Sequence, residues 1–178
     1  MKTTILTMLT CGLLLSASTL ASDPSLGPAI TGYGPTFAIV ERDVALQDDF
    51  VYRAVFDSAA YEDETAINVD LVSVARYLNM HARNGVPLKN MDLAVVVHGA
   101  ALKNLLKDTA YQSRYGIRNP NLELIGKLHA AGVQFFVCGQ SMAFGGVDKQ
   151  ALIDDVQVAL SAMTMLTVLQ TQGYALLP

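Results

Sequence analysis

Two residues with reactive side chains each follow a short apolar run of the sequence. His98 comes directly after the run at 93–97, and Cys138 comes directly after the run at 133–137. A thiolate is a nucleophile, and a nearby imidazole can accept the proton of the thiol. If the two runs are neighbouring strands, the side chains lie at the same edge of a sheet. The sequence therefore predicts a reactive-cysteine site in which Cys138 is the nucleophile and His98 tunes its reactivity.

The loop that follows the cysteine is rich in small residues. It reads CGQSMAFGG over 138–146. Backbone N–H groups of this loop that point at the sulfur would favour the thiolate over the thiol. A serine hydroxyl would add a further donor. We therefore expect the binding residues of the site to be Gly99, Gly139, Gln140 and Ser141.

Less reactive interpretations of the same residues stand beside this one. Free cysteine is among the most buried residue types, so Cys138 can equally be an inert core residue. His98 can cap a strand end through backbone hydrogen bonds, and no third residue that would orient it is evident. One cysteine and one histidine fall short of the three or four ligands that zinc needs, so neither a metal nor a cofactor is predicted. His81 and His129 fall within predicted helices and are expected at the surface.

The first 21 residues have the pattern of a secretory signal peptide. Lys2 precedes an apolar run at 5–15, and small residues lead up to Ala21, after which cleavage is expected. The run is shorter than the about 20 residues that cross a bilayer, so a retained anchor is the weaker alternative. Cleavage removes Cys11 and leaves Cys138 as the single thiol. We expect a periplasmic or secreted protein with no membrane span after cleavage.

Composition limits the size and the partners of the protein. The chain has 178 residues, of which 52% are hydrophobic and 16% charged, which suits one domain with a sizeable core. Its net charge of −4 and its pI of 5.2 argue against nucleic acid as a partner, because phosphate binding requires clustered Lys and Arg.

The order of the predicted elements indicates the fold class. Residues 22–49 form an extended N-terminal arm rich in Pro and Gly near its start. Strands are expected at 50–57, 93–97, 133–137 and 156–160, with a short extra strand at 37–40 and an edge segment at 174–177. Helices are expected at 67–83, 100–106, 120–131, 148–153 and 162–172, whereas 108–118 is a polar excursion and 139–146 a loop. This alternation predicts a single small α/β domain with a mostly parallel sheet of about five strands flanked by helices.

Three segments carry a resemblance to a known family. They are VVVHG at 95–99, NPNLELIGKLHAAGVQFFVCGQS at 119–141 and LSAMTMLTVLQTQGY at 160–174. They resemble the DsrE/DsrF-like (sulfur-relay) family, in its exported, uncharacterised branch, and the resemblance makes 50–178 a DsrE-like α/β domain. It implies assembly as a trimer or hexamer, and it implies that the cysteine at position 138 carries a persulfide.

Residues and resemblance together lead to a functional hypothesis. We expect a periplasmic sulfur-handling or thiol-redox protein, which carries sulfane sulfur as a persulfide or exchanges disulfides through Cys138 with a sulfur donor or acceptor protein. Whether it turns over as a sulfurtransferase-like enzyme is left open. The final helix is apolar nearly all round, which indicates core packing by default and, together with the resemblance, favours a contact between subunits of a homo-oligomer. The alternative is a non-catalytic oligomeric module that binds a small ligand. Hydrolase chemistry ranks last, because no Ser-His-Asp arrangement is recognisable.

Overall fold

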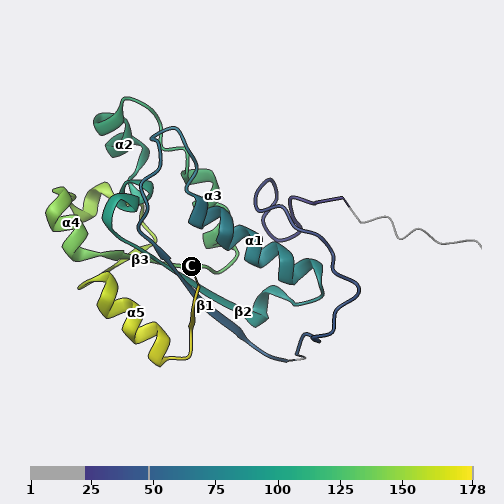
Figure 1. The fold of residues 1–178 in the computed structure, drawn as a ribbon. Helices are drawn as coiled ribbons and strands as arrows, with labels where there is room; N and C mark the ends of the chain where they lie inside the picture. The colour runs from purple at the N-terminus through teal and green to yellow at the C-terminus, as the bar shows by residue number, and fades with distance from the viewer. Residues whose placement is uncertain (1–22, 48, 178) are drawn as a thin grey trace, which may run out of the picture.

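The computed structural model describes residues 23–47 and 49–177, and the predicted signal peptide at 1–21 lies outside them. The described residues form one five-stranded sheet in which every pairing is parallel. Its order is β4-β3-β2-β1-β5 (Figure 1). The strands are β1 (Tyr52–Ser58), β2 (Met91–Val97), β3 (Gln134–Cys138), β4 (Val156–Ala159) and β5 (Ala175–Leu177). The predicted α/β fold with a mostly parallel sheet is confirmed.

Helices connect the strands and cover the sheet. The α-helices are α1 (Val69–Arg83), α2 (Asp108–Tyr115), α3 (Leu122–Ala130), α4 (Gly139–Gly145) and α5 (Ala162–Thr171). Short 3₁₀ segments lie at Leu88–Asn90, Gly99–Leu105 and Lys149–Ala151. None of the helices within the described residues is both long and apolar enough to cross a bilayer.

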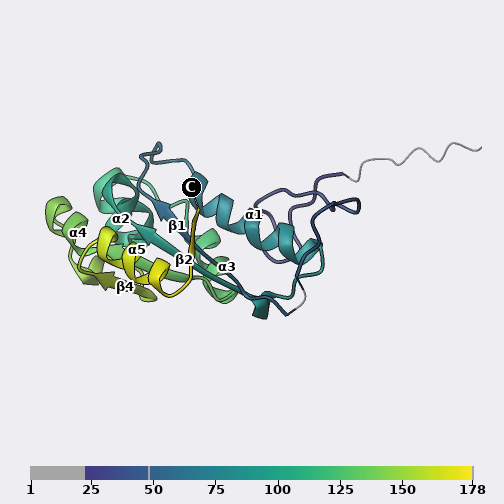
Figure 2. The same cartoon turned by 60° about the horizontal axis from the view of Figure 1, so that its bottom comes forward.

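The direction in which successive strands are added to the sheet decides which face of the sheet each connecting helix covers. From β1 to β4 the strands are added in one direction, so right-handed crossovers place α1, α3 and α4 on the same face. The connection from β4 to β5 runs back across the sheet, and α5 consequently lies on the opposite face (Figure 2). Parallel sheets need cover on both faces, and on this second face α5 supplies it.

The two faces bury cores of different size. The larger core joins helix residues such as Leu78, Leu124 and Met142 to the inward side chains Val95 and Phe135 of the sheet. The smaller core lies under α5. It contains Val55, Ala94, Val96, Phe136, Cys138, Ala162, Leu169 and Tyr174. The single cysteine of the described residues therefore belongs to the thinner layer.

Two segments that lack a predicted helix are helical in the structure. The expected excursion at 108–118 contains α2, because Tyr111 is fully buried and anchors it while Gly116, at φ +76°, ends it. The expected loop at 139–146 contains α4. There the Cys138 sulfur accepts the Ser141 N–H as an N-cap, and Met142 is buried. The local sequence carries no clear helix signal for α2 or α4, because the stability of both helices comes from tertiary packing.

The expected strand at 37–40 is absent from the structure. The backbone N–H of Ile39 donates to the Asn84 side chain at 3.0 Å in place of a strand partner. In the arm, one isolated bridge joins Ser25 and Thr36. The segment at 37–40 is thus held by a side chain from the end of α1, and the sheet does not extend to it.

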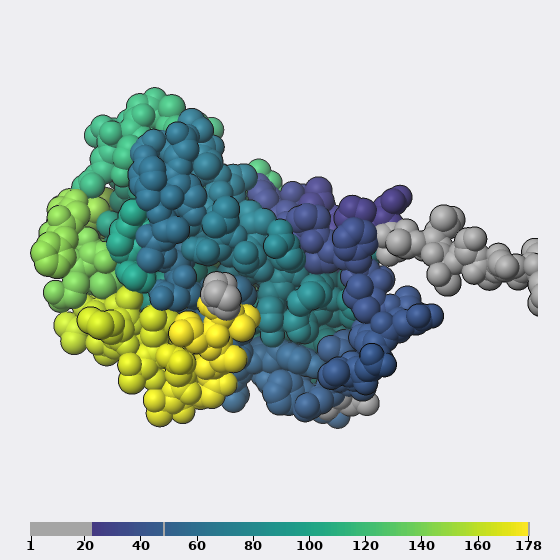
Figure 3. All heavy atoms as spheres, viewed as in Figure 1, coloured from purple at the N-terminus to yellow at the C-terminus, as the bar shows by residue number. Residues whose placement is uncertain are grey.

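The N-terminal arm is fastened to α1 by one buried amide. Asn79, fully buried, accepts the Ile30 N–H at 2.7 Å and donates to the carbonyl oxygens of Ile30, Tyr33 and Gly34. Gly34 lies so close that a Cβ there would fall 2.3 Å from the backbone nitrogen of Arg76. Figure 3 shows the purple residues of the arm against the teal surface of the helix layer.

Candidate functional site

Cys138 lies at the carboxyl ends of two neighbouring strands whose following connections go to opposite faces of the sheet. It is the last residue of β3 and pairs with Ala159, the last residue of β4. The chain leaves β3 toward α4 on one face and leaves β4 toward α5 on the other. Open parallel sheets bind ligands in the crevice at such a reversal, outside the carboxyl ends of the strands. The cysteine therefore occupies the position at which this fold class places its chemistry.

The Cys138 sulfur is hydrogen-bonded at the start of α4, where the Ser141 N–H donates to Sγ at 3.4 Å. The Ser141 hydroxyl and the N–H groups of Gln140 and Ala162 also favour the thiolate. Burial raises the pKa of the Cys138 thiol, but these hydrogen bonds together outweigh it and lower the pKa below its ordinary value. The residue is 5% exposed, so its sulfur is enclosed by polar donors as well as by apolar neighbours. Such a setting favours the thiolate.

Ser141 joins the two strand ends that carry the candidate residues. Its Oγ accepts the Gly99 N–H at 2.9 Å, while its N–H donates to the cysteine sulfur. β2 and β3 are direct neighbours, with Val97 opposite Val137. His98 and Cys138 therefore end adjacent strands, which is the arrangement that the sequence alone leaves open.

His98 has a carboxylate partner that the sequence did not reveal. Its Nε2 lies 2.8 Å from Oδ1 of Asp57, near the end of β1, and its backbone N–H donates to the Ser58 carbonyl at 2.9 Å. A carboxylate can only accept, so Nε2 carries the hydrogen of this contact. Both side chains are about one-third exposed, at 30% and 37%. Asp57 is thus a third polar side chain at these strand ends, in contact with the His98 ring.

Strand alternation puts all three side chains on the face that α5 covers. Val55, Val96 and Phe136 belong to the core under α5, and each lies two residues before one of the three. Across β3, β2 and β1 the row therefore reads Cys138, His98, Asp57. Among the described residues, His98 is hydrogen-bonded to the carboxylate and the sulfur to its own N–H donors, with no hydrogen bond between ring and sulfur.

The predicted binding residues shape the walls of the crevice. A Cβ at Gly139 would lie 2.8 Å from the Ala159 carbonyl oxygen, so only glycine lets β3 and β4 approach here. Gln140 Nε2 reaches the Leu160 carbonyl at 3.5 Å. These contacts join α4 to the β4–α5 connection. They therefore hold the start of α4 and the start of α5 close to each other beside the cysteine.

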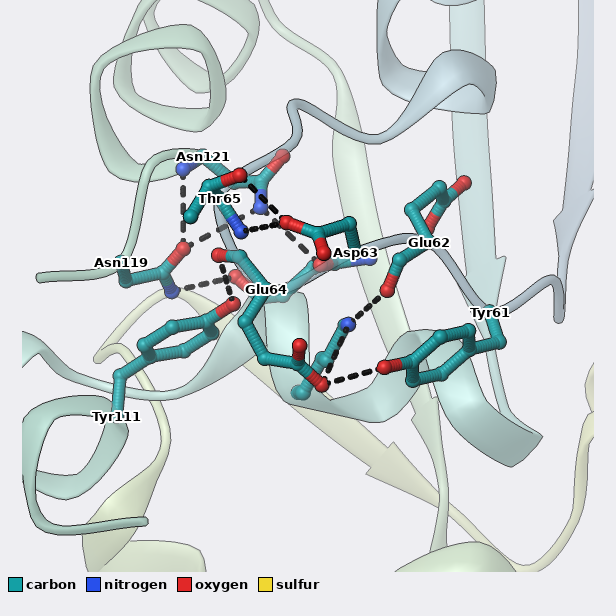
Figure 4. Close-up of polar contacts among 10 residues, drawn as sticks. Tyr61, Glu62, Asp63, Glu64, Thr65, Tyr111, Asn119 and Asn121 are labelled. Carbon is teal, nitrogen blue, oxygen red and sulfur yellow. Dashed lines mark hydrogen bonds and ion pairs between the residues drawn. The ribbon is translucent and has the colours of Figure 1, made fainter. Parts of the chain in front are cut away.

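A polar network holds the connection after β1 over the 3₁₀ segment that follows His98 (Figure 4). Tyr111 donates its hydroxyl to the Glu64 carbonyl at 2.7 Å, and Tyr61 donates to the Glu64 carboxylate at 2.6 Å. Asp63 accepts the Thr65 N–H at 2.8 Å. The buried Lys103 ammonium donates to the Glu62 carbonyl and lies 4.1 Å from the centre of the Tyr61 ring. The network braces the strand ends that carry the histidine and its carboxylate.

A pocket opens beside the cysteine loop. Its volume is about 410 Å³, within the range of small-molecule sites, and Gly99, Ser141, Arg114 and Phe144 contribute to its lining. A larger cavity of about 670 Å³ lies between the arm and the α1–β2 connection, lined in part by Arg42 and Lys89. The larger one contains no residue of the Cys138 site. The lining of the smaller pocket includes the predicted binding residues Gly99 and Ser141, but neither Cys138 nor His98.

The remaining histidines take no part in the site. His81 is half-buried at the end of α1, stacked on Tyr77 with ring centres 4.0 Å apart, and burial lowers its pKa. His129 is exposed and lies near Asp155. Over residues 23–47 and 49–177 there is no group of three or more His, Cys, Asp or Glu side chains that could hold a metal ion.

Comparison with known proteins identifies the family. The model of the DsrE/DsrF-like family matches residues 51–178, which include the whole sheet and the Cys138 loop. The chain belongs to the DsrE/DsrF-like family. No curated protein matches this DsrE/DsrF-like chain. The solved structures that are similar in fold include that of the protein of unknown function MTH1491 from Methanobacterium thermoautotrophicum, with 21% identity and a TM-score of 0.52 over 71% of this chain and 97% of that one.

Proposed function

We propose that this DsrE/DsrF-like protein is a sulfur carrier that holds sulfane sulfur as a persulfide on Cys138. Family membership supports a sulfur-relay role in general. The observation that carries the specific proposal is the Ser141 N–H that donates to the cysteine sulfur at 3.4 Å, together with the Ser141 hydroxyl and the Gln140 and Ala162 N–H groups, which help to lower the pKa of the thiol despite its burial. A packing cysteine has no need of donors from two separate connections.

The loading step transfers one sulfur atom without net oxidation. The Cys138 thiol gives its proton to His98, and the thiolate attacks the outer sulfur of a donor persulfide, R–S–S–H. A new S–S bond forms at Cys138 Sγ while the S–S bond of the donor breaks. The leaving thiolate R–S⁻ takes the proton back from the imidazolium. Unloading onto an acceptor thiolate is the same step in reverse.

The burial of the sulfur favours a persulfide over a mixed disulfide between proteins. At 5% exposure, Sγ can be reached by a small sulfur species, whereas a mixed disulfide requires a second protein chain to approach the crevice floor. A persulfide adds only one sulfur atom to the thiol, and the pocket lined by Gly99 and Ser141 lies beside the cysteine loop. We therefore place persulfide carriage ahead of disulfide exchange.

Intact mass spectrometry tests the proposal. The protein without residues 1–21 is incubated anaerobically with polysulfide and then passed through a desalting column. We expect the wild type to gain the mass of one or more sulfur atoms at Cys138 and to lose it on treatment with dithiothreitol. Cys138→Ser is expected to gain nothing. A wild type that shows no added sulfur contradicts the carrier function and leaves the small-ligand binding module.

We further propose that the carrier works in the periplasm or outside the cell. The support is the charged start, apolar run and small residues of positions 1–21. N-terminal sequencing of the protein from the periplasmic fraction is expected to begin at Ser22. Retention of residues 1–21 in that material contradicts export by cleavage.

We also propose that the protein forms a homo-oligomer through the face of the sheet that α5 covers. Apolar side chains are exposed on α5 and on the segments next to it, and exposed apolar surface of this kind is typical of a protein interface. They are Leu160, Met163, Val168 and Leu176, with exposures from 39% to 77%. Figure 3 shows this yellow surface continuing into the green surface of α4 beside the cysteine loop.

A further inference from the structure

We propose that Asp57 is a positioning residue of the site, which fixes the His98 ring in the tautomer that leaves Nδ1 free to exchange a proton with Cys138. The inference deepens the proposed function and rests on it, because the role concerns proton transfer at the sulfur that is loaded. Its starting point is the 2.8 Å contact between His98 Nε2 and Asp57 Oδ1.

The backbone on both sides of this contact is rigid. Asp57 lies opposite Val96 in the β1–β2 pairing, and the His98 N–H donates to the Ser58 carbonyl, so the two strands stay in register past the last paired residue. The ring is therefore held by a side-chain and a backbone hydrogen bond together. A histidine that only capped a strand end would not need the carboxylate.

The Asp57 carboxylate can only accept a hydrogen bond, and this decides the tautomer of the His98 ring. An ionised carboxylate has no hydrogen to give, so the proton of a neutral ring resides on Nε2 and Nδ1 keeps its lone pair. When Nδ1 takes the proton of the thiol, the ring becomes an imidazolium and the contact to Asp57 becomes an ion pair. The carboxylate thus assists the step twice, first by orienting the base and then by stabilising the charge it acquires.

The α-helices that flank the row of three carry no titratable side chain. α4 and α5 contain none. β5 contains none either. On the 3₁₀ segment after His98, the Lys103 ammonium donates to the Glu62 carbonyl and lies 3.8 Å from the Glu64 carboxylate. The titratable groups that share this end of the α5 face within β1, β2 and β3 are Asp57, His98 and Cys138 themselves. A change in proton transfer on removal of the carboxylate is therefore assignable to this row.

The test combines a spectroscopic readout with a rate. Nitrogen-15 NMR reports which ring nitrogen of His98 carries the proton, and iodoacetamide labelling at neutral pH reports thiol reactivity. In Asp57→Asn the amide is expected to donate to Nε2, which moves the ring proton to Nδ1, and labelling is expected to slow about tenfold or more. Asp57→Glu keeps an acceptor-only group and is expected to retain most of the rate. Asp92→Asn, which removes a carboxylate paired with Arg53 at the other end of the same face, is the matched control.

A double-mutant cycle separates positioning from a direct effect. In a His98→Gln background, Asp57→Asn is expected to change the labelling rate less than twofold. A tenfold loss in that background, or an unchanged tautomer in the single variant, overturns the proposal. Failure of the carrier function gives a different result, since polysulfide then adds no sulfur to the wild type while the effect of Asp57→Asn on tautomer and labelling persists.

Discussion

His98 Nε2 lies 2.8 Å from Asp57 Oδ1 across the carboxyl ends of two neighbouring parallel strands. The next strand along the sheet ends in Cys138, so the proposed base and its carboxylate lie on the strand ends next to the one that carries the thiol. The groups that lower the pKa of this thiol come from two connections that leave the sheet toward opposite faces. The proposed proton acceptor and the groups that favour the thiolate therefore come from different parts of the chain. The following changes probe these contributions separately.

Removal of the Ser141 hydroxyl is expected to make the thiol less acidic. Ser141→Ala keeps the backbone N–H but loses the side-chain hydrogen bond to the sulfur, one of the groups that lower the pKa of Cys138. The pKa therefore rises, the pH midpoint of alkylation moves upward, and the rate at neutral pH falls several-fold. Stopped-flow labelling across pH measures the shift. Ser73→Ala, which removes a hydroxyl bonded to Val69 on α1, is expected to leave the midpoint in place.

A methyl group at position 139 is expected to strain the crevice. In Gly139→Ala the new Cβ would lie 2.8 Å from the Ala159 carbonyl, so β3 and β4 must separate locally. We expect a loss of about 1–3 kcal/mol in unfolding free energy, typical of overpacking, together with slower alkylation of the thiol. Urea denaturation and labelling measure the two effects.

Gly126→Ala in α3 serves as the matched glycine control. Its added Cβ meets nothing within 4 Å, so helix propensity dominates and the variant gains about 0.5–1 kcal/mol. Equal destabilisation of both glycine variants would contradict a specific role for the close approach at position 139.

Loss of the buried amide at position 79 is expected to release the arm. Asn79→Ala removes four hydrogen bonds to the backbone of Ile30, Tyr33 and Gly34. We expect a loss of about 2–4 kcal/mol in unfolding free energy, because the arm groups lose their buried partners. Limited proteolysis is expected to cut within residues 23–47 faster than in the wild type. Asn90→Ala, outside these contacts, is the control, and equal protease resistance of wild type and Asn79→Ala would argue against the anchor.

Charge on the α5 face is expected to separate subunits. Met163 is 77% exposed on α5, so Met163→Glu places a carboxylate inside the proposed interface. Sedimentation velocity at micromolar concentration is expected to show an oligomer for the wild type and a smaller species for the variant. Val44→Glu, at a comparably exposed apolar residue of the arm, controls for added charge. A wild type that sediments as a monomer contradicts assembly through this face.

The sheet could be predicted from the sequence because its strands are continuous apolar runs between turn residues. The same reasoning placed His98 and Cys138 at strand ends, but their adjacency depends on strand order, which periodicity does not encode. Asp57 was the last residue of the first predicted strand, and the strand-end rule that singled out the other two would have included it. α4 escaped prediction because its N-cap is a cysteine sulfur, which is not among the usual capping groups.

The order in which the chain is synthesised has a consequence for the thiol. One of the N–H donors to Cys138 belongs to Ala162, the first residue of α5, and β5 then docks that helix against β1. A nascent or refolding chain in which α5 has not yet folded has its cysteine but not the Ala162 contribution to its lowered pKa. Under the proposed function, the thiol therefore reaches its full acidity only after α5 has packed against the sheet.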